Sequence, residues 1–140
     1  MSTFVNPPES GYFEGRRYDV ARLYEFAETI PTEEIPLDAF REVISPQNES
    51  WLGTDGKIIG PFNIYKDWTA AQANPIWHRH VESIRNVSLD VPILATYTGY
   101  VLDGQHRVVR SFIEKRSVIK IKRLPRVLPE WAVLPSKQTA

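Results

Sequence analysis

The residue types most able to do chemistry lie together in one short stretch. Asp103, Gly104, Gln105, His106 and Arg107 are consecutive, between an apolar segment and a segment with helical periodicity. A helix N-terminus leaves backbone N–H groups without partners and carries a partial positive charge. A guanidinium in the first turn is unfavourable there unless an anion offsets it, and a phosphate does so while accepting two hydrogen bonds from the arginine. The stretch therefore predicts a phosphate-binding turn at residues 103–107.

Each side chain of this stretch has an expected role and a structural alternative. Gly104 would let a ligand approach the backbone closely, and His106 can donate, accept or shuttle a proton near neutral pH. Asp103 would cap the helix, or hold a metal ion or a substrate hydroxyl. In the structural alternative, Asp103 is only an N-cap, Gly104 only a turn residue, and Arg107 only the ion-pair partner of Asp103.

The elements that must position these residues follow from hydrophobic periodicity and from capping residues. Helices are predicted over residues 18–29, 74–86 and 105–115. Asp19 and Asn74 are suited to cap the first two, and the third has a buried stripe at Val108, Val109, Phe112 and Ile113. Strands are predicted over residues 33–37, before the Thr98–Gly99 turn, over 100–102, and along 118–125, where Ile119 and Ile121 point inward and Lys120 and Lys122 outward.

This order of elements predicts an α+β (mixed α/β) domain with a small mixed sheet and flanking helices. Residues 1–17 are expected to be an N-terminal arm, residues 18–126 the domain, and residues 127–140 a proline-rich tail that wraps the surface. Residues 41–73 show no regular pattern apart from a predicted turn at Thr54–Lys57. Pro36 indicates that the first strand lies at an edge of the sheet or is very short.

The composition limits the classes of function. The chain has 140 residues and no cysteine, which excludes disulfides, thiolate catalysis and cysteine-ligated metals. No apolar run reaches the roughly 20 residues that span a bilayer, and the N-terminus lacks the pattern of a secretory signal. We therefore expect a cytoplasmic protein with no membrane partner.

The net charge is zero, but the charge is unevenly distributed. Residues 1–90 hold 8 Lys and Arg against 14 Asp and Glu, whereas residues 91–140 hold 9 against 3. Residues 107–126 contain one acid, Glu114, and eight basic residues, namely Arg107, Arg110, Lys115, Arg116, Lys120, Lys122, Arg123 and Arg126. This distribution favours an anionic partner, either a phosphate group or nucleic acid. The alternative is a solvated basic face, with the lysines of the last strand discouraging edge pairing.

The segment VPILATYTGYVLDGQHRVVRSFIEKRSVIKIKRLP, residues 91–125, resembles the ParB/sulfiredoxin superfamily, in which a strand ends in a D-G-x-H-R motif that opens a helix and is followed by a basic strand. EEIPLDAF also resembles the opening strand of that family. The resemblance implies a ParB/sulfiredoxin-like fold over roughly residues 33–125. It further implies that Gly104, Gln105, His106 and Arg107 surround nucleotide phosphates.

The resemblance also separates the functions within the superfamily. Sulfiredoxins need a cysteine where this chain has Gln105, and chromosome-partitioning members add a helix-turn-helix domain where we expect only the proline-rich tail. The family's single-domain kinases of small hydroxyl substrates keep D-G-x-H-R and place a glutamate just after the first strand, where this chain has Glu42. The resemblance thus implies ATP, ADP or CTP with Mg²⁺, Asp103 positioning metal or substrate, His106 orienting or protonating phosphate, and Glu42 as catalytic base.

The reaction at this turn would be phosphoryl transfer or nucleotide hydrolysis. Two other functions stay open: a DNA-binding protein or nuclease that uses residues 107–126, and a non-catalytic interaction protein on the same fold. Glu42 is alternatively a surface glutamate in a loop. His78 and His80 are two residues apart, a spacing that does not favour a helical metal pair, although His80 or Arg79 could reach a nucleotide. Trp51 and Trp68 would be core or clamp residues, or would stack on a base.

Overall fold

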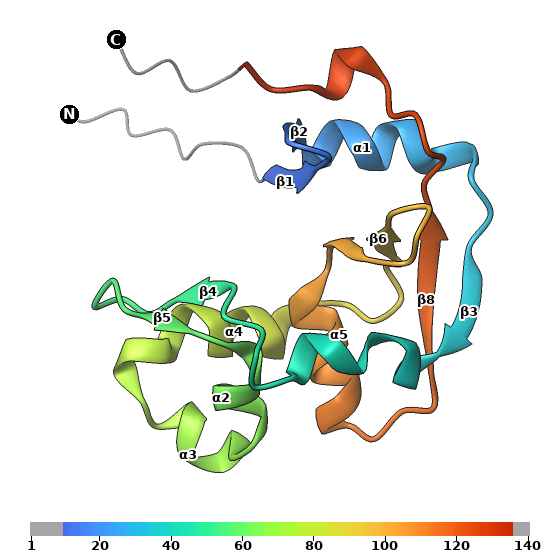
Figure 1. Ribbon diagram of the computed structural model, residues 1–140. Helices are drawn as coiled ribbons and strands as arrows, with labels where there is room; N and C mark the ends of the chain where they lie inside the picture. Colours follow the sequence, from blue (N-terminus) through green and yellow to red (C-terminus); the bar gives the residue numbers. More distant parts are fainter. Residues whose placement is uncertain (1–9, 136–140) are drawn as a thin grey trace, which may run out of the picture.

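The computed structural model describes residues 10–135, which form an α+β fold around a small mixed sheet (Figure 1). The strands are β1 Ser10–Phe13, β2 Arg16–Asp19, β3 Glu33–Pro36, β4 Trp51–Leu52, β5 Ile58–Ile59, β6 Ile93–Ala95, β7 Val101–Asp103 and β8 Val118–Arg123. The α-helices are α1 Val20–Phe26, α2 Pro61–Tyr65, α3 Trp68–Gln72, α4 His78–Asn86 and α5 Gln105–Ile113. Short 3-10 helices are η1 Ala27–Thr29, η2 Leu37–Ile44, η3 Pro75–Trp77 and η4 Glu130–Ala132. The predicted fold class is confirmed.

The central sheet has four strands in the order β3-β8-β6-β7. β8 pairs antiparallel with β3 and parallel with β6, and β6 pairs antiparallel with β7. The edge position predicted for the strand with Pro36 is therefore confirmed. The suggestion that the lysines of β8 discourage edge pairing is wrong, because β8 lies between two other strands.

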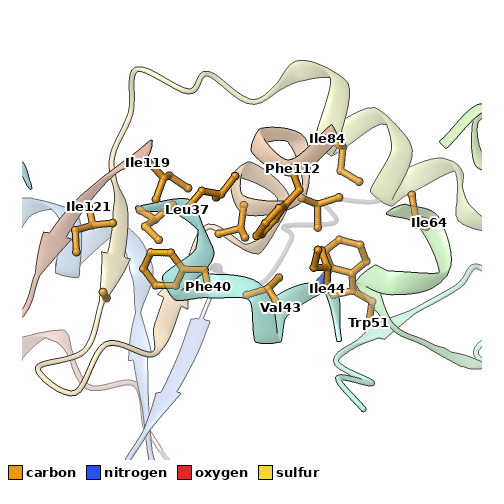
Figure 2. Packing of buried hydrophobic residues seen from close by; sticks show 14 of the residues in the cluster. Leu37, Phe40, Val43, Ile44, Trp51, Ile64, Ile84, Phe112, Ile119 and Ile121 are labelled. Atoms are coloured by element: carbon orange, nitrogen blue, oxygen red, sulfur yellow. The ribbon is translucent and has the colours of Figure 1, made fainter. Parts of the chain in front are cut away.

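The side chains of β6 alternate between two hydrophobic cores, one on each face of the sheet. Ile93 and Ala95 belong to the larger core, in which η2, α2, α4 and α5 contribute, whereas Leu94 belongs to the smaller one beneath α1 and η4 (Figure 2 shows the larger). In Figure 1, α1 and the β1–β2 hairpin lie on one side of β6 and α5 on the other. Burial on both faces explains why β6 reads as a continuous apolar run.

The predicted helices and caps agree with the structure. Asp19 accepts a hydrogen bond from the backbone N–H of Arg22 at 3.2 Å, and Asn74 accepts one from Ile76 at 3.0 Å. The buried stripe of α5 is confirmed for Val108, Val109 and Phe112, while Ile113 is half-buried at the edge of the same core.

The segments predicted to be irregular contain several short elements. The expected arm includes the β1–β2 hairpin, and the boundary drawn at residue 17 falls inside β2; residues 1–9 lie outside the described part. Residues 41–73 contain the end of η2, the β4–β5 hairpin, α2 and α3, and the predicted turn closes that hairpin. The described part of the tail contributes Leu128 and Ala132 to the smaller core rather than only covering the surface; residues 136–140 lie outside the described part.

The predicted alternation of inward isoleucines and outward lysines along β8 is only partly confirmed. Ile119 and Ile121 are buried, as predicted. Lys122 does not extend into solvent, because its ammonium donates to the carbonyl oxygens of Ala27 and Glu28 at 2.8 and 3.4 Å. Those carbonyls end α1 and η1, where a positive charge is favourable.

Candidate functional site

The turn of residues 103–107 is the start of α5, as the sequence predicted, but its cap is different. Gly104 is the N-cap residue, with φ at +118°, and no side chain caps the helix. The capping role considered for Asp103 is therefore wrong. The first helical hydrogen bond runs from the N–H of Val108 to the carbonyl of Gly104 at 3.1 Å, so the amides of Gln105, His106 and Arg107 precede it.

Packing alone requires a glycine at position 104. A Cβ built at this residue would lie 2.5 Å from Cγ2 of Ile93, and a φ of +118° is one that other residues rarely adopt. The missing side chain thus allows β6 and the start of α5 to approach each other. Close approach by a ligand is not needed to explain the glycine, and its role in phosphate binding stays a prediction.

Arg107, Asp103 and Tyr24 form a connected polar group. The Tyr24 hydroxyl accepts a hydrogen bond from Nη1 of Arg107 at 2.9 Å and donates one to Oδ2 of Asp103 at 2.9 Å. The guanidinium is also 3.8 Å from the same carboxylate oxygen, and the two side chains are 18% and 24% exposed. Burial and the neighbouring carboxylate raise the pKa of the Tyr24 hydroxyl. The internal carboxylate therefore supplies part of the negative charge that the sequence argument assigned to a ligand.

The guanidinium of Arg107 is nevertheless not fully satisfied. Its Nε is buried and has no hydrogen-bond partner within residues 10–135. A guanidinium has five N–H donors, and the tyrosine hydroxyl accepts from only one of its nitrogens. An anion beside Arg107 would therefore find hydrogen-bonding capacity still open.

His106 belongs to a chain of three hydrogen-bonding groups. Its Nε2 is 2.9 Å from Nδ1 of His80, and Nε2 of His80 is 2.8 Å from the carbonyl oxygen of Leu52. Both imidazoles stack on the indole of Trp51, with ring centroids 4.5 Å from it. Trp51 is buried in this arrangement, so it acts as the clamp that the sequence suggested rather than as an open platform for a base.

The donor and acceptor roles along these hydrogen bonds determine the tautomers of His80 and His106. The Leu52 carbonyl can only accept, so Nε2 of His80 carries a proton. Burial lowers the pKa of His80, so its Nδ1 is the acceptor and Nε2 of His106 donates to it. Burial, with contributions from His80 and Arg107, lowers the pKa of His106 to about 4. His106 is thus neutral at pH 7: its Nε2–H donates to His80, and the nitrogen that remains, Nδ1, carries the lone pair and is an acceptor.

The neutral state of His106 has a consequence for stability. An ordinary histidine has a pKa of 6.5, so between that value and about 4 the unfolded chain binds a proton that the folded chain does not. The free energy of unfolding should therefore fall as the pH falls from 7 to 4, by about 3 kcal/mol from this residue. Urea unfolding at a series of pH values measures this slope.

Two variants isolate the contribution of His106 to that slope. His106→Gln should flatten the decline in this pH range, whatever its own stability at pH 7. His78→Gln, which changes an exposed histidine at the start of α4, should leave the decline as in the wild type. Equal slopes for all three proteins would contradict the buried, neutral imidazole.

Two cavities flank the start of α5. The first, of about 260 Å³, is lined by Ser83, Asn86, Val87, Asp103, Gly104, His106 and Arg107. The second, of about 510 Å³, is lined by Glu42, Val43, Ser45, Gln47, Asn48, Tyr100, Val101 and Gln105. The structure therefore brings four of the predicted site residues to one cavity, and places Glu42 with Gln105 at the other. The catalytic role of Glu42, whose side chain is exposed at the end of η2, stays a prediction.

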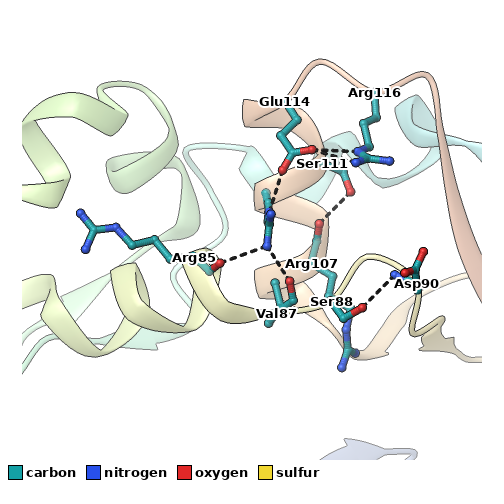
Figure 3. A network of polar contacts seen from close by, with 9 residues as sticks. Arg85, Val87, Ser88, Asp90, Arg107, Ser111, Glu114 and Arg116 are labelled. Atoms are coloured by element: carbon teal, nitrogen blue, oxygen red, sulfur yellow. Dashed lines mark hydrogen bonds and ion pairs between the residues drawn. The ribbon is translucent and has the colours of Figure 1, made fainter.

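The far half of α5 is fixed by a separate polar network (Figure 3). Arg110 donates to the carbonyls of Arg85 and Val87 at 3.0 and 2.6 Å, at the end of α4, and to Glu114 at 2.7 Å. Arg116 also binds Glu114. Arg110 therefore holds α5 against the end of α4. Three basic residues of the stretch 107–126, namely Arg110, Arg116 and Lys122, are engaged in contacts within the protein.

Three side chains of the site lie far from the D-G-x-H-R motif in sequence. Tyr24 is 79 residues from Asp103, and His80 is 26 residues from His106. Ser50 donates to the side-chain oxygen of Gln105 at 2.9 Å, so this contact leaves both N–H donors of the Gln105 amino group unused. Of these three, the sequence analysis singled out only His80. The spacing from His78 argued against a metal site there, but His80 was expected to be able to reach a nucleotide.

The arrangement offers few ligands for a metal ion. No group of three or more Asp, Glu, His or Cys side chains within residues 10–135 is placed to hold one. Within the same residues, no helix has the length and apolar character needed to cross a membrane.

Comparisons of the chain with models of protein families, with curated proteins and with solved structures find no match. The resemblance to the ParB/sulfiredoxin superfamily therefore depends on the motif at residues 103–107 and its flanking strands, and stays a prediction.

Proposed function

We propose that the protein binds the phosphates of a nucleotide in the cavity at the start of α5, as a single-domain protein of the ParB/sulfiredoxin type acting in the cytoplasm. The observation that carries the proposal is the position of Arg107. Its guanidinium lines a cavity together with the first turn of α5, which has three amides ahead of the first helical hydrogen bond and no side-chain cap. Both features favour an anion.

Mg²⁺ fits this site as a companion of the phosphates rather than as a resident ion. Mg²⁺ in nucleotide sites keeps several waters and uses one or two carboxylates together with phosphate oxygens. Asp103 is the one carboxylate among the residues that line the phosphate cavity, and it would contact the hydrated ion when a nucleotide brings it. The metal would supply neutralisation of the developing charge on the phosphates.

The reaction that we propose is phosphoryl transfer to a small hydroxyl compound, or to water. The acceptor would lie in the larger cavity, where Glu42 would take the proton from its hydroxyl and the Gln105 amino group, oriented by Ser50, would face it. No residue of the described part of the chain lines both cavities, so the terminal phosphate would extend across the first turn of α5 to meet the acceptor. The hydroxyl oxygen forms a bond to the terminal phosphorus as the bond to the leaving phosphate breaks. His106 lines the phosphate cavity, and its Nδ1 would accept a hydrogen bond from a protonated phosphate oxygen or from a water of the hydrated Mg²⁺, because an ionised phosphate offers no donor.

Calorimetric titration of the wild-type protein with ATP, ADP and CTP, each with Mg²⁺, tests the binding directly. We expect at least one nucleotide to bind with a micromolar dissociation constant, and inorganic phosphate to compete with it. Absence of heat with all three nucleotides at millimolar concentration would contradict the proposal.

A second prediction tests Glu42 as the base. Glu42→Gln should lower phosphate release from the bound nucleotide about 100-fold, the range typical of a general base, while its nucleotide affinity stays that of the wild type. Water serves as the acceptor in this assay, so the natural substrate is not needed. Glu49→Gln, an exposed glutamate outside both cavities, is the matched control and should keep full turnover. Unchanged turnover in Glu42→Gln would remove Glu42 from the mechanism.

A further inference from the structure

Three tyrosines lie exposed around one hollow, away from the phosphate cavity. Tyr12, Tyr97 and Tyr100 are 70%, 38% and 68% exposed, and all three line a hollow of about 330 Å³. We call them the tyrosine surface. Large aromatic side chains that gather in one exposed hollow usually serve an interaction, because scattered single residues are the norm elsewhere.

The tyrosine surface is built on rigid backbone. Tyr97 and Tyr100 flank the tight turn between β6 and β7, which is closed by two backbone hydrogen bonds, from Thr96 N–H to the Tyr100 carbonyl at 2.8 Å and from Gly99 N–H to the Thr96 carbonyl at 2.9 Å. Tyr12 belongs to β1, which packs on β7 so closely that a Cβ on Gly11 would lie 2.9 Å from the Leu102 carbonyl. The backbone that carries the three rings is therefore fixed before any ligand binds, and the ring of Tyr97 also packs edge-on against Phe13.

Cationic groups lie at the edge of this hollow. The guanidinium of Arg126 lies over the ring of Tyr97, 5.8 Å from its centroid. A guanidinium nitrogen of Arg123 lies beside the Gly99 turn, 3.7 Å from where a Cβ would be, and Arg123 also lies 3.7 Å from exposed Glu33. Glu14 is the one acid among the residues that line the hollow.

We propose that the tyrosine surface binds single-stranded DNA, with bases stacked on Tyr12, Tyr97 and Tyr100 and phosphates beside Arg126 and Arg123. Exposed aromatic rings next to guanidinium groups are the arrangement that single-strand binding uses, since every base has a face that stacks. Of the other lining side chains, Phe13, Val101 and Leu102 are apolar, and the hydroxyls of Thr96 and Thr98 hydrogen-bond to each other. Few lining groups are therefore left to contact the 2′-hydroxyls that distinguish RNA, which suits deoxyribose better. This inference does not depend on nucleotide binding at α5.

The position of Tyr100 adds a geometric consequence. It lines both this hollow and the cavity that holds Glu42 and Gln105. A strand stacked on the tyrosine surface would therefore reach the opening of that second cavity.

Fluorescence anisotropy with labelled oligothymidylate of about 20 nucleotides, at about 50 mM salt, tests the inference. The wild-type protein should bind it more tightly than a duplex of the same length. The double variant Tyr12→Ala/Tyr100→Ala should bind about 30-fold more weakly, because stacking contributes about 1–3 kcal/mol per base. Tyr12→Phe/Tyr100→Phe keeps the rings and should remain within about threefold of wild type.

Further variants separate the charge from the rings and from general surface effects. Arg126→Ala should lower the slope of log affinity against log salt by about 0.7, the value for one lost phosphate contact on a single strand. Leu52→Ala/Ile58→Ala removes two comparably exposed apolar side chains from the β4–β5 hairpin and should not change binding. Arg107→Ala, which tests the nucleotide site, should bind the oligonucleotide as the wild type does.

Several results would overturn the inference. They are the absence of oligothymidylate binding to the wild-type protein, equal binding by Tyr12→Ala/Tyr100→Ala in a form that unfolds at the wild-type temperature, and equal or tighter binding of a duplex. Tighter binding of oligouridylate would overturn the assignment to DNA, and displacement of the oligonucleotide by a proline-rich peptide at micromolar concentration would assign the surface to a protein partner.

Discussion

Replacing Arg107 with alanine should weaken nucleotide binding about 100-fold, equivalent to about 2.7 kcal/mol. Hydrogen bonds from a charged group contribute about 1.5–3 kcal/mol each in net terms, and a guanidinium offers two in parallel to a phosphate. The remaining amides at the start of α5 would still attract the anion, which is why binding should weaken rather than disappear. Calorimetry with the tightest-binding nucleotide measures the loss.

Two matched variants show whether geometry or charge is responsible. Arg107→Lys keeps the positive charge but loses the planar fork, so an intermediate loss of about tenfold is expected. Arg116→Ala removes one positive charge just after α5. Arg116 pairs with Glu114 and does not line the phosphate cavity, so this variant should bind nucleotide as the wild type does. Thermal unfolding with and without nucleotide gives an independent readout, because a ligand that binds only the folded state raises the unfolding temperature.

The result that would contradict the phosphate site is equally clear. If Arg107→Ala is folded and binds nucleotide as tightly as the wild type, then the guanidinium serves only its internal partners. In that case the contacts of Arg107 with Tyr24 and Asp103 would be its whole role, which is the structural alternative that the sequence left open.

The sequence predicted the elements whose patterns are long or chemically marked. The alternation along β8 placed Ile119 and Ile121 in the core, Pro36 placed β3 at an edge, and Asp19 and Asn74 marked helix starts. Residues 41–73 escaped prediction because β4, β5, α2 and α3 have between two and five residues each, too few to show a period.

The candidate site was predicted less completely than the fold. The motif located Asp103, Gly104, His106 and Arg107 at one cavity, because neighbours at a helix start stay neighbours in space. The partners that set their chemistry could not be predicted, since single-sequence patterns carry no information about contacts over long separations. Tyr24, which bridges Asp103 and Arg107, and His80, which fixes the tautomer of His106, are both contacts of that kind.

Substitution of Gly104 should have the second large effect, on stability. The sequence argument explained this glycine by the approach of a ligand, whereas the structure explains it by packing against Ile93. Gly104→Ala should lower the free energy of unfolding by about 3–4 kcal/mol, which combines the cost of a positive φ with that of an added methyl group in a filled space. The methyl carbon would lie 2.5 Å from Cγ2 and 2.8 Å from Cβ of Ile93, in the buried strand β6. Urea unfolding at pH 7 measures the change.

Gly56→Ala is the control that separates the two costs. Gly56 also has a positive φ, +79°, but a Cβ there would meet nothing within 4 Å, so the substitution should cost only about 1 kcal/mol. In an Ile93→Ala background the cost of Gly104→Ala should fall by about 1–2 kcal/mol, because the nearest methyl group is gone. Equal costs at the two glycines would mean that β6 does not press on the start of α5. The absence of a side chain at Gly104 would then be left for a ligand to explain, as the sequence argument first held.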